Sequence, residues 1–565
     1  MNKIIILISL FLNFLFGYVV CLNENNQKSQ NLIIPTYSIK LKSDGEYLVY
    51  SGNDTLSIAQ ASYTNEMMSI GWGYISITTN PKYNDSLQIE AAGYLEGYLS
   101  YEMIWQNWNN MMVNQNANNS FGNDIISWAK ENILYMNQQI QLNQNDPYWI
   151  NVNLVLQQLN GLTNGYSDAN QNPDRQLSLM DFILLNMNVE IYDIMNSLKN
   201  NSSSFYQQPN NNSFDNNQHC SALIKLTDDL TELYTGHTTW SDYYQMVRMI
   251  KSYNFRFSKL VAAKSNTTMF SGYPGVLMSV DDFYMLDSKL VVLETTNGIK
   301  DNDSELFKLI KPQSVLTWIR IIVTNRIAHS GKSWCEIFEK ENSGTYNNQW
   351  MIVDYNKFIK GVRVQDGTLY VFEQLPGYVE YADVTNILRT GYWPSFNVPY
   401  FETISNMSGF NYQSSSSDSS SSSGSIAYEQ YPRSQIFRRD SNKVYSISDF
   451  QAFMRYNDFQ NDPLAYGDPG NQISSRFDLI TPQNNASAAG GIDSKVTSLE
   501  LINQFLMIAQ SGPTHDQEPP FSWSSENWKN KYPTIGQPDT FDFEWVTFST
   551  TSFGSFPSAS NEKNY

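Results

Sequence analysis

Cys220 is the residue whose setting most favours catalysis. It begins the apolar segment Cys220 to Lys225 (CSALIK), directly after a polar stretch that runs from Asn200 to His219. That stretch has little to bury, so we expect residues 200–219 to form a flexible, protease-accessible linker. A cut between His219 and Cys220 would place a new α-amine beside the thiol. An α-amine has a reference pKa of about 7.7–8.0, and it supplies the base that a thiol nucleophile needs.

Two other interpretations of Cys220 stay open at this point. The first is an inert, buried thiol. The second is a disulfide with Cys335, the other cysteine that remains after the first 21 residues. A chain of 565 residues does not need a single bridge for its stability, so we expect no disulfide.

His237 is the second candidate for chemistry. It stands in the segment GHTTW, Gly236 to Trp240, and is one of only four histidines. Its functional role would be proton transfer or substrate positioning near the thiol, and the alternative is a structural histidine. The sequence has no metal-ligand spacing, GxSxG elbow, P-loop or GxGxxG motif. We therefore expect no metal and no organic cofactor.

Amide and guanidinium side chains could complete such a site. Asn397 is a candidate donor to an oxyanion, and Asn347 and Asn348 are alternatives of the same chemistry. Each of these asparagines is equally compatible with a turn. Arg433 could hold a carboxylate or phosphate head group through two parallel hydrogen bonds, or form a surface ion pair.

The composition and net charge limit the kinds of molecule that the protein is expected to bind. The chain is 41% hydrophobic and 14% aromatic, which is ample for one large core or two domains. Its net charge of −19 argues against nucleic-acid binding, which needs a basic surface. The same charge opposes attachment to an anionic membrane, and it suits an acidic compartment that protonates carboxylates.

The N-terminal end predicts the secretory route. Lys3 precedes the apolar run Ile4 to Leu12, so we expect residues 1–21 to be a signal peptide. No later segment approaches the roughly 20 apolar residues of a membrane-spanning helix, so we expect no transmembrane anchor. Ten glycosylation sequons fit a secreted or lysosomal glycoprotein: Asn53, Asn84, Asn118, Asn200, Asn201, Asn211, Asn266, Asn302, Asn406 and Asn485.

Apolar patterning divides the chain at Cys220. We expect residues 22–199 to form a largely helical fragment that packs on the core, with strands between Tyr47 and Thr79 and a helix from Ser178 to about Leu198. A further helix face is marked by Ala91, Leu95, Tyr98, Tyr101 and Trp105.

Residues 220–565 are predicted to form the nucleophile-bearing core. The predicted helices are 241–253 and 315–327, and the predicted strands are 289–295, 350–353 and 369–372. The nearly pure serine run 414–425 is a predicted insertion without core-forming residues. Strands with helices before, between and after them indicate a layered α+β domain.

Several segments, in this order, resemble the phospholipase B-like family, also called the lamina-ancestor-like family. They are HCSALIK from His219, GHTTW from Gly236, YPG from Tyr273, DDFY from Asp281, LETT from Leu293, NSGTYNNQWMIVDY from Asn342, EQLPG from Glu373 and RYND from Arg455.

That resemblance implies a fold and a site. The family is similar to N-terminal-nucleophile hydrolases, which implies a four-layer αββα sandwich and cleavage between His219 and Cys220, with the two fragments staying associated. Cys220 would be the nucleophile, and His237 and Asn397 would lie near it. Supporting or substrate-binding positions would be Trp240, Thr295 and Arg433.

Three functions compete. The first is an acyl hydrolase that releases fatty acids from glycerophospholipids through the exposed cysteine. The second is an amidase of the same fold that acts on N-acyl lipids or peptides. The third is a non-catalytic lysosomal binding glycoprotein. Thioester formation is common to the first two, so the sequence does not separate them.

Overall fold

A computed structural model describes residues 34–115, 122–198, 220–301, 304–410 and 428–550. Several predictions fall outside these residues. They concern the signal peptide, the linker 200–219 with His219, the serine run 414–425, and the sequons at Asn118, Asn200, Asn201, Asn211 and Asn302.

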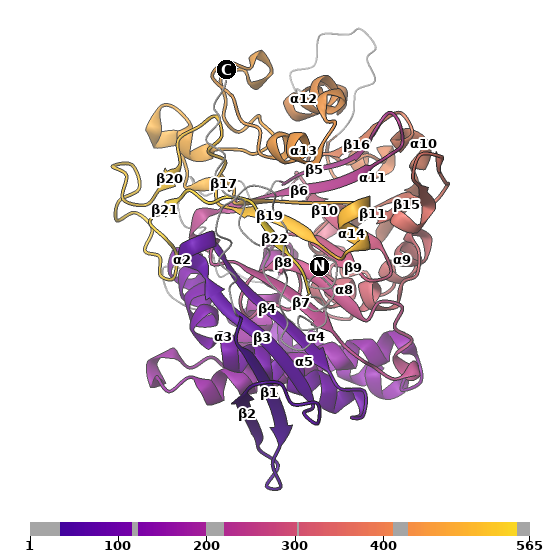
Figure 1. Ribbon diagram of the computed structural model, residues 1–565, viewed down its shortest axis with the longest axis vertical. Coiled ribbons are helices and arrows are strands. Elements are labelled where there is room, and N and C mark those ends of the chain that lie inside the picture. The colour runs from indigo at the N-terminus through magenta and orange to yellow at the C-terminus, as the bar shows by residue number, and fades with distance from the viewer. Residues whose placement is uncertain (1–33, 116–121, 199–219, 302–303, 411–427, 551–565) are drawn as a thin grey trace, which may run out of the picture.

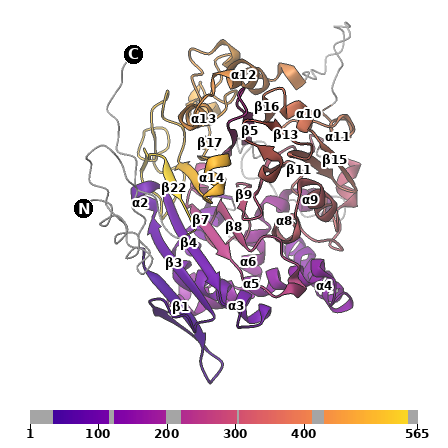
Figure 2. The same ribbon diagram turned by 45° about the vertical axis from the view of Figure 1, so that its right-hand side comes forward.

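The larger of two main sheets has eleven strands in the order β15-β14-β11-β10-β9-β8-β7-β4-β3-β1-β2. Figures 1 and 2 show it running through the lower and middle part of the molecule. In chain order its strands are β1 Thr36–Leu41, β2 Tyr47–Ser51, β3 Ala59–Glu66, β4 Trp72–Thr79, β7 Met249–Asn254, β8 Thr267–Gly272, β9 Phe283–Leu286, β10 Leu290–Thr296, β11 Asn348–Asp354, β14 Leu369–Leu375 and β15 Tyr378–Asp383.

The smaller sheet carries Cys220 on its strand β5. Its order is β16-β5-β6-β18-β19-β22, and β17 pairs with β6 outside that path. The strands are β5 Cys220–Leu226, β6 Leu233–Asp242, β16 Tyr392–Ser395, β17 Ala489–Gly491, β18 Asp493–Ser498, β19 Met507–Ser511 and β22 Val546–Phe548. Two further two-stranded ribbons pair β12 Phe358–Ile359 with β13 Arg363–Val364, and β20 Phe521–Ser522 with β21 Thr540–Phe541.

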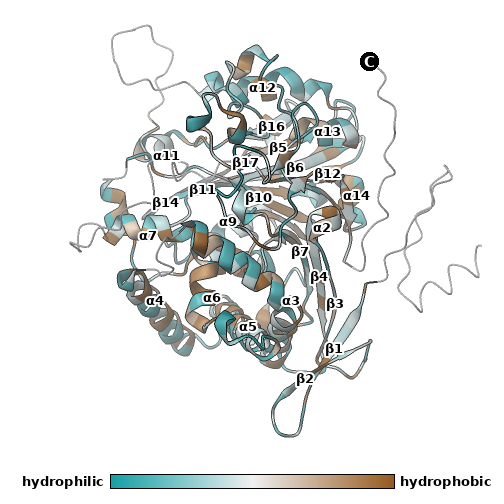
Figure 3. Cartoon of the chain, turned by 90° about the vertical axis from the view of Figure 1, so that its left-hand side faces the viewer, coloured by the Kyte–Doolittle hydropathy of each residue, from teal (hydrophilic) through white to brown (hydrophobic). Residues whose placement is uncertain are grey.

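Helices pack against both sheets. Helix α3 contacts strands β3 and β4 of the larger sheet, and α13 contacts β6 and β18 of the smaller one. Strand β5 contacts β10, so the two sheets meet at these strands. Figure 3 shows hydrophilic residues, in teal, alternating with hydrophobic ones, in brown, along outer helices such as α4 and α12. The helices are α2 Met67–Ile70, α3 Asp85–Gln115, α4 Asn123–Leu142, α5 Pro147–Ala169, α6 Leu179–Asn186, α7 Ile191–Leu198, α8 Thr317–Ile327, α9 Gly331–Phe338, α10 Thr385–Leu388, α11 Glu402–Met407, α12 Pro432–Asp440, α13 Ile447–Met454 and α14 Leu499–Asn503.

The mixed α+β class predicted from the sequence is confirmed. The four-layer αββα order in particular stays a prediction. Most of the predicted elements are present, among them the strands of 47–79, the helix marked by Ala91 to Trp105, the helix α8, and the strands β10, β11 and β14.

The segment before Cys220 is more than a helical layer. It contributes β1 to β4 to the larger sheet, and β4 pairs in parallel with β7 from the segment after Cys220. This pairing joins residues 73–78 to residues 249–254. Chain on both sides of Cys220 therefore builds one continuous sheet, as the indigo and magenta strands of Figure 1 show.

Two helix predictions need correction. Residues 241–253 are not a helix: β6 ends at Asp242, a short 3₁₀ turn follows at Tyr243–Gln245, and β7 begins at Met249. Strand β7 lies inside the larger sheet and is buried almost throughout, so its apolar residues show no strand-like alternation. The helix predicted from Ser178 has the expected capping box with Asp181, but it is divided by a 3₁₀ turn before α7.

Glycines bring α3 and α5 together in the N-terminal segment. A Cβ atom at Gly93 would lie 2.1 Å from the carbonyl oxygen of Gln158, and one at Gly165 would lie 2.1 Å from that of Tyr94. Any side chain at these positions would push the helices apart, because the obstacle is backbone. The close crossing fixes α5, and with it Gln158, against the larger sheet.

Surface features agree with parts of the sequence analysis. The five sequon asparagines within the described residues are all exposed: Asn53, Asn84, Asn266, Asn406 and Asn485. Within the described ranges, no helix is long and apolar enough to cross a membrane.

Candidate active site

The pairing of β5 with β6 brings the first predicted site residues together. Cys220 lies opposite Thr239, and Ala222 lies opposite His237. Opposed residues of an antiparallel pair share a face, and so do residues two positions apart, so Cys220, Thr239 and His237 are on one face. Cys220 is 2% exposed and His237 is fully buried. The thiol and the imidazole therefore share a water-poor interior.

Hydrogen bonds fix the tautomer of His237. Its Nε2 lies 2.8 Å from the carbonyl oxygen of Glu294, which can only accept, so Nε2 carries the proton. Its Nδ1 is then an acceptor and lies 3.4 Å from Oγ1 of Thr239. Burial lowers the pKa of His237 well below its usual value. The ring is therefore neutral and Nδ1 presents a lone pair, but the lowered pKa makes it a weak proton acceptor.

A buried lysine stands behind this histidine. Lys495 lies opposite His237 on β18 and donates to Thr239 Oγ1 and, at 2.6 Å, to Asp493 Oδ1. Burial lowers the pKa of Lys495 to about 8. The other oxygen of Asp493 accepts from Arg248 at 2.6 Å. These contacts place positive charge beside the thiol face while neutralising Asp493.

Two buried acids and a tyrosine also lie near Cys220. Tyr346 donates its hydroxyl to Asp282 Oδ2 at 2.6 Å and contacts Glu294 Oε1 at 3.1 Å. Burial raises the pKa of Asp282 to about 7 and raises that of Glu294 well above its usual value. Because two adjacent carboxylates cannot both ionise cheaply in such a site, this pair holds a proton near neutral pH.

Asn397 holds the backbone nitrogen of Cys220. Cys220 N donates to Asn397 Oδ1 at 3.0 Å, and Asn397 Nδ2 donates to the carbonyl of Thr296 at 2.8 Å. Asn397 has φ of 65°, a left-handed conformation that asparagine tolerates better than most residues. The nitrogen that a cut would turn into an α-amine is thus already oriented by a side chain.

Arg433 clamps the same corner from helix α12. It donates to the carbonyl of Cys220 at 2.5 Å, to the carbonyl of Phe396 at 2.7 Å and to Asn397 Oδ1 at 2.8 Å. Its guanidinium lies 4.3 Å from the ring centroid of Trp240. Arg433 is therefore neither a surface ion pair nor free to bind a head group with all its donors.

Thr295 completes the set of predicted residues. Its Oγ1 lies 2.6 Å from Ser395 Oγ and accepts from Asn397 N at 3.4 Å. The six residues singled out from the sequence thus lie in one buried region. Of the two alternative amides, Asn347 donates to the carbonyl of Gly344 at 2.9 Å, and the buried side chain of Asn348 has no hydrogen-bond partner among the described residues.

The thiol itself is protonated in this environment. Burial, and next the charge of Glu294, raise the pKa of Cys220 well above its usual value. Cys220 and Cys335 are both free, so the disulfide alternative is wrong. A buried thiol needs a nearby base before it can attack, and the α-amine expected after a cut would be bonded to the same residue.

Three side chains here are also of metal-binding types. One ligand atom each from Cys220, His237 and Glu294 lies within 4.8 Å of the others. A cation placed among them would face the ammonium of Lys495, and His237 Nε2 already donates to a carbonyl. The arrangement suits proton transfer better than metal binding.

Sequence reasoning missed much of this polar centre. Glu294, Asp282 and Tyr346 were not singled out, and neither were Lys495 and Asp493. The first three lie within segments that carry the family resemblance, which is the signal that could have identified them. Lys495 and Asp493 have no such signal, because only the pairing of β18 with β6 brings them near His237.

Comparison with known proteins agrees with the resemblance. The family model described as Phospholipase B matches residues 59–548. Phospholipase B-like protein B of Dictyostelium discoideum is 61% identical over 525 residues, which cover 92% of this chain and 90% of that protein. Proteins A and D of the same name and organism are 47% and 43% identical, and each alignment covers 93% or more of this chain and 94% of the relative.

The crystal structure of a mutant of conjugated bile acid hydrolase from Clostridium perfringens covers 57% of this chain and 99% of its own, with a TM-score of 0.29 and 12% identity. That likeness is too distant to inform the fold or the activity. The match to the family model over most of the chain, and the high identity to the amoebal proteins, place the chain in the phospholipase B-like family.

Proposed function

We propose that this protein is an acyl hydrolase that releases fatty acids from glycerophospholipids through Cys220, after a self-catalysed cut between His219 and Cys220. One observation carries the proposal. The nitrogen and the carbonyl of Cys220 are each held by a side chain, the buried Asn397 and the half-buried Arg433, while its thiol faces His237 and Glu294. A structural cysteine needs none of these contacts.

The cut would begin with attack of the Cys220 thiol on the carbonyl carbon of His219. The thiol proton passes to a neighbouring base, for which His237 Nδ1 is the candidate within the described residues. The C–N bond then breaks, its nitrogen takes up a proton, and the acidic pair Asp282–Glu294 is a nearby source. Water hydrolyses the resulting thioester, which restores the thiol and leaves an α-amine on Cys220.

Lipid hydrolysis would use the same sulfur. The α-amine accepts the thiol proton, the thiolate attacks the ester carbonyl, and the proton passes to the leaving alcohol. Water then attacks the thioester and releases the fatty acid. Asn397 would hold the amine through Oδ1. The second hydrogen of its Nδ2 is the part that remains for an oxyanion, since the first is used by Thr296.

The two fragments would stay together after the cut. The parallel pairing of β4 with β7 is one of the contacts that would join them. Another is Glu190, whose carboxylate accepts from the backbone nitrogens of Thr317 and Trp318 at the start of α8 at 2.9 and 3.0 Å. A third is Glu96, which accepts from Lys251 and Tyr253 at 2.6 Å each. Both acids are buried, so separating the two fragments would cost free energy.

We also propose that the protein follows the secretory route to an extracellular or lysosomal site, as a glycoprotein. The five exposed sequons support this. Mass spectrometry of protein purified from its own cells, before and after enzymatic deglycosylation, tests it. A mature chain that keeps residues 1–21 and carries no glycan would overturn this part.

N-terminal sequencing and parallel assays test the activity. We expect a fragment that begins at Cys220, and fatty acid release from phosphatidylcholine by wild type but not by Cys220→Ala. A matched N-acyl amide is assayed beside it. Release from the amide alone would replace the ester hydrolase by an amidase. Equal lipid turnover by wild type and Cys220→Ala would remove the catalytic role of Cys220.

A further inference from the structure

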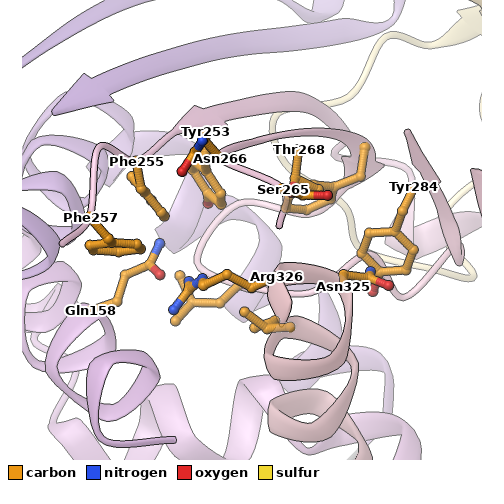
Figure 4. A pocket seen from close by; sticks show the side chains of 13 residues that line it. Gln158, Tyr253, Phe255, Phe257, Ser265, Asn266, Thr268, Tyr284, Asn325 and Arg326 are labelled. Carbon is orange, nitrogen blue, oxygen red and sulfur yellow. The ribbon is translucent and has the colours of Figure 1, made fainter. Parts of the chain in front are cut away.

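A cavity that contains no residue of the candidate active site lies between the larger sheet and two helices. Figure 4 shows it from close by. Its walls come from helix α5, helix α8, strands β8 and β9, and the end of strand β7 with the chain that follows. The residues used below are Arg326, Gln158, Asn325, Phe255 and Phe257. None of them has a part in the proposed reaction.

Arg326 is a buried cation without an acidic partner. The residue is 6% exposed, and its one hydrogen bond to a side chain among residues 34–115, 122–198, 220–301, 304–410 and 428–550 is from Nη1 to Asn151 Oδ1 at 3.2 Å. Among the described residues, no aspartate or glutamate forms an ion pair with it. A guanidinium has five N–H donors, and those not taken by Asn151 are open to solvent or to a ligand. In a chain of net charge −19, a buried arginine left without a carboxylate is unexpected.

Two amide groups in the same cavity also lack partners. Gln158 is 1% exposed and Asn325 is 2% exposed, and within the part of the chain that the structure describes neither the Nε2 of the first nor the Nδ2 of the second has a hydrogen-bond partner. Trp334 fixes the orientation of Asn325 by donating to its Oδ1 at 2.8 Å. A buried N–H donor without an acceptor is unfavourable, and a bound acceptor at this place would satisfy it.

Aromatic rings hold the guanidinium in place. The ring centroids of Phe255 and Phe257 lie 5.7 and 5.0 Å from the Arg326 carbon Cζ. Phe257 is partly exposed, and Asn266 beside the cavity is exposed, so this end reaches solvent. In Figure 4 the Gln158 amide lies near the Arg326 guanidinium, so a ligand could bridge the two.

We propose that this cavity binds a small oxyanion, a carboxylate or a phosphate group, between Arg326 and the amide nitrogen of Gln158. Arginine and amide N–H groups are the donors that such anions take, and the aromatic walls accept a short apolar substituent. Gln158 precedes Cys220 in the chain and Arg326 follows it. A bound anion would therefore link the two segments that a cut before Cys220 creates.

Thermal unfolding of the full chain tests the site. Wild type is titrated with inorganic phosphate, glycerol 3-phosphate and butyrate at constant ionic strength, which separates a phosphate source from a fatty-acid-like one. We expect at least one of them to raise the melting temperature with saturation, since a ligand that binds only the folded state stabilises it. No saturable rise with any of the three would overturn the proposal.

Matched variants locate the binding. Arg326→Met should weaken binding by about tenfold or more, because a charge-assisted pair is lost. Arg256→Met removes an exposed arginine near the cavity and should leave binding unchanged. Equal binding by wild type and Arg326→Met would refute the site.

If Arg326→Met does not fold, the variant Gln158→Leu tests whether the anion binds in this cavity. It removes an unpartnered amide, so it should keep or raise the melting temperature without ligand and still weaken the anion effect. An undiminished anion effect would contradict the proposal. Cys220→Ala should bind as wild type does, so failure of the proposed hydrolase activity and failure of this site are distinguishable.

Discussion

The two cysteines within the described residues are both buried, but Cys220 has polar and charged neighbours and Cys335 lies among aromatic residues. Cys220 is 2% exposed and Cys335 is fully buried, both are free, and burial raises the pKa of both thiols. Around Cys220 stand an imidazole, two acids, a lysine and an arginine clamp. Around Cys335 the helix α9 packs aromatic rings, with Trp334 stacked at 4.5 Å on Phe338.

This difference shows that burial alone does not make a nucleophile. Cys335 behaves as a small apolar residue in a core, as buried cysteines commonly do. Cys220 begins a strand whose first nitrogen and first carbonyl are both bound by side chains. We therefore expect the reactive cysteine to be the one whose backbone nitrogen and carbonyl are bound by side chains, which is Cys220.

The largest expected effect comes from removing each sulfur in turn. Cys220→Ala should abolish the cut and lower activity by a factor of about 1,000 or more, since a covalent nucleophile is lost. Cys335→Ala should keep both. Gel analysis of the cut and a lipid assay measure this. Loss of the cut in Cys335→Ala, with folding intact, would break the distinction between the two thiols.

The next effect tests the clamp. Arg433→Met should slow the cut by about 10- to 100-fold, because the carbonyl of Cys220 and Oδ1 of Asn397 lose a charged donor. Arg438→Met on the same helix is exposed and serves as the control. The time course of fragment appearance gives the rate. Equal rates in both variants would show that the clamp has no part in the cut.

A smaller effect is expected on stability as a function of pH. Asp282 has a folded pKa of about 7, above its unfolded value of 3.8, so the folded state binds the extra proton between these values. Its contribution is fully present below about pH 4 and is lost as the pH rises through 7. Asp193, Glu373 and Asp242 shift in the same direction. His237, whose pKa is lowered, acts in the opposite direction below pH 6.5.

The melting temperature should therefore be higher at pH 5 than at pH 8. Asp282→Asn should reduce this difference, whereas Cys335→Ala should not change it. Scanning calorimetry across that range measures both variants beside wild type. A melting temperature that rises steadily from pH 5 to pH 8 would contradict the raised pKa values.

The smallest effect concerns the core around Cys335. Cys335→Ala should lower the free energy of unfolding by about 1 kcal/mol, as expected for the loss of a small buried group. Cys335→Ser should cost more, because it buries a hydroxyl among aromatic rings. Denaturant unfolding gives the difference. Equal stabilities of the two variants would show that this pocket is more polar than its neighbours suggest.

Parts of this site could be predicted from the sequence and parts could not. Cys220 was identified from its position after a polar stretch, and His237, Asn397 and Arg433 from residue chemistry together with the family resemblance. Lys495 is distant from all of them in the chain, and only strand pairing brings it close. Periodicity failed at 241–253 because a strand buried on both faces has no alternation to detect.

The parallel pairing of β4 with β7 has a consequence for how the protein ages. Before a cut at Cys220, the two strands are parts of one molecule and refold as neighbours. After the proposed cut they would belong to separate polypeptides, so recovery from denaturation would become a second-order encounter that dilution slows. The mature form would then be assembled only once, and its lifetime would be set by the rate at which that sheet first opens.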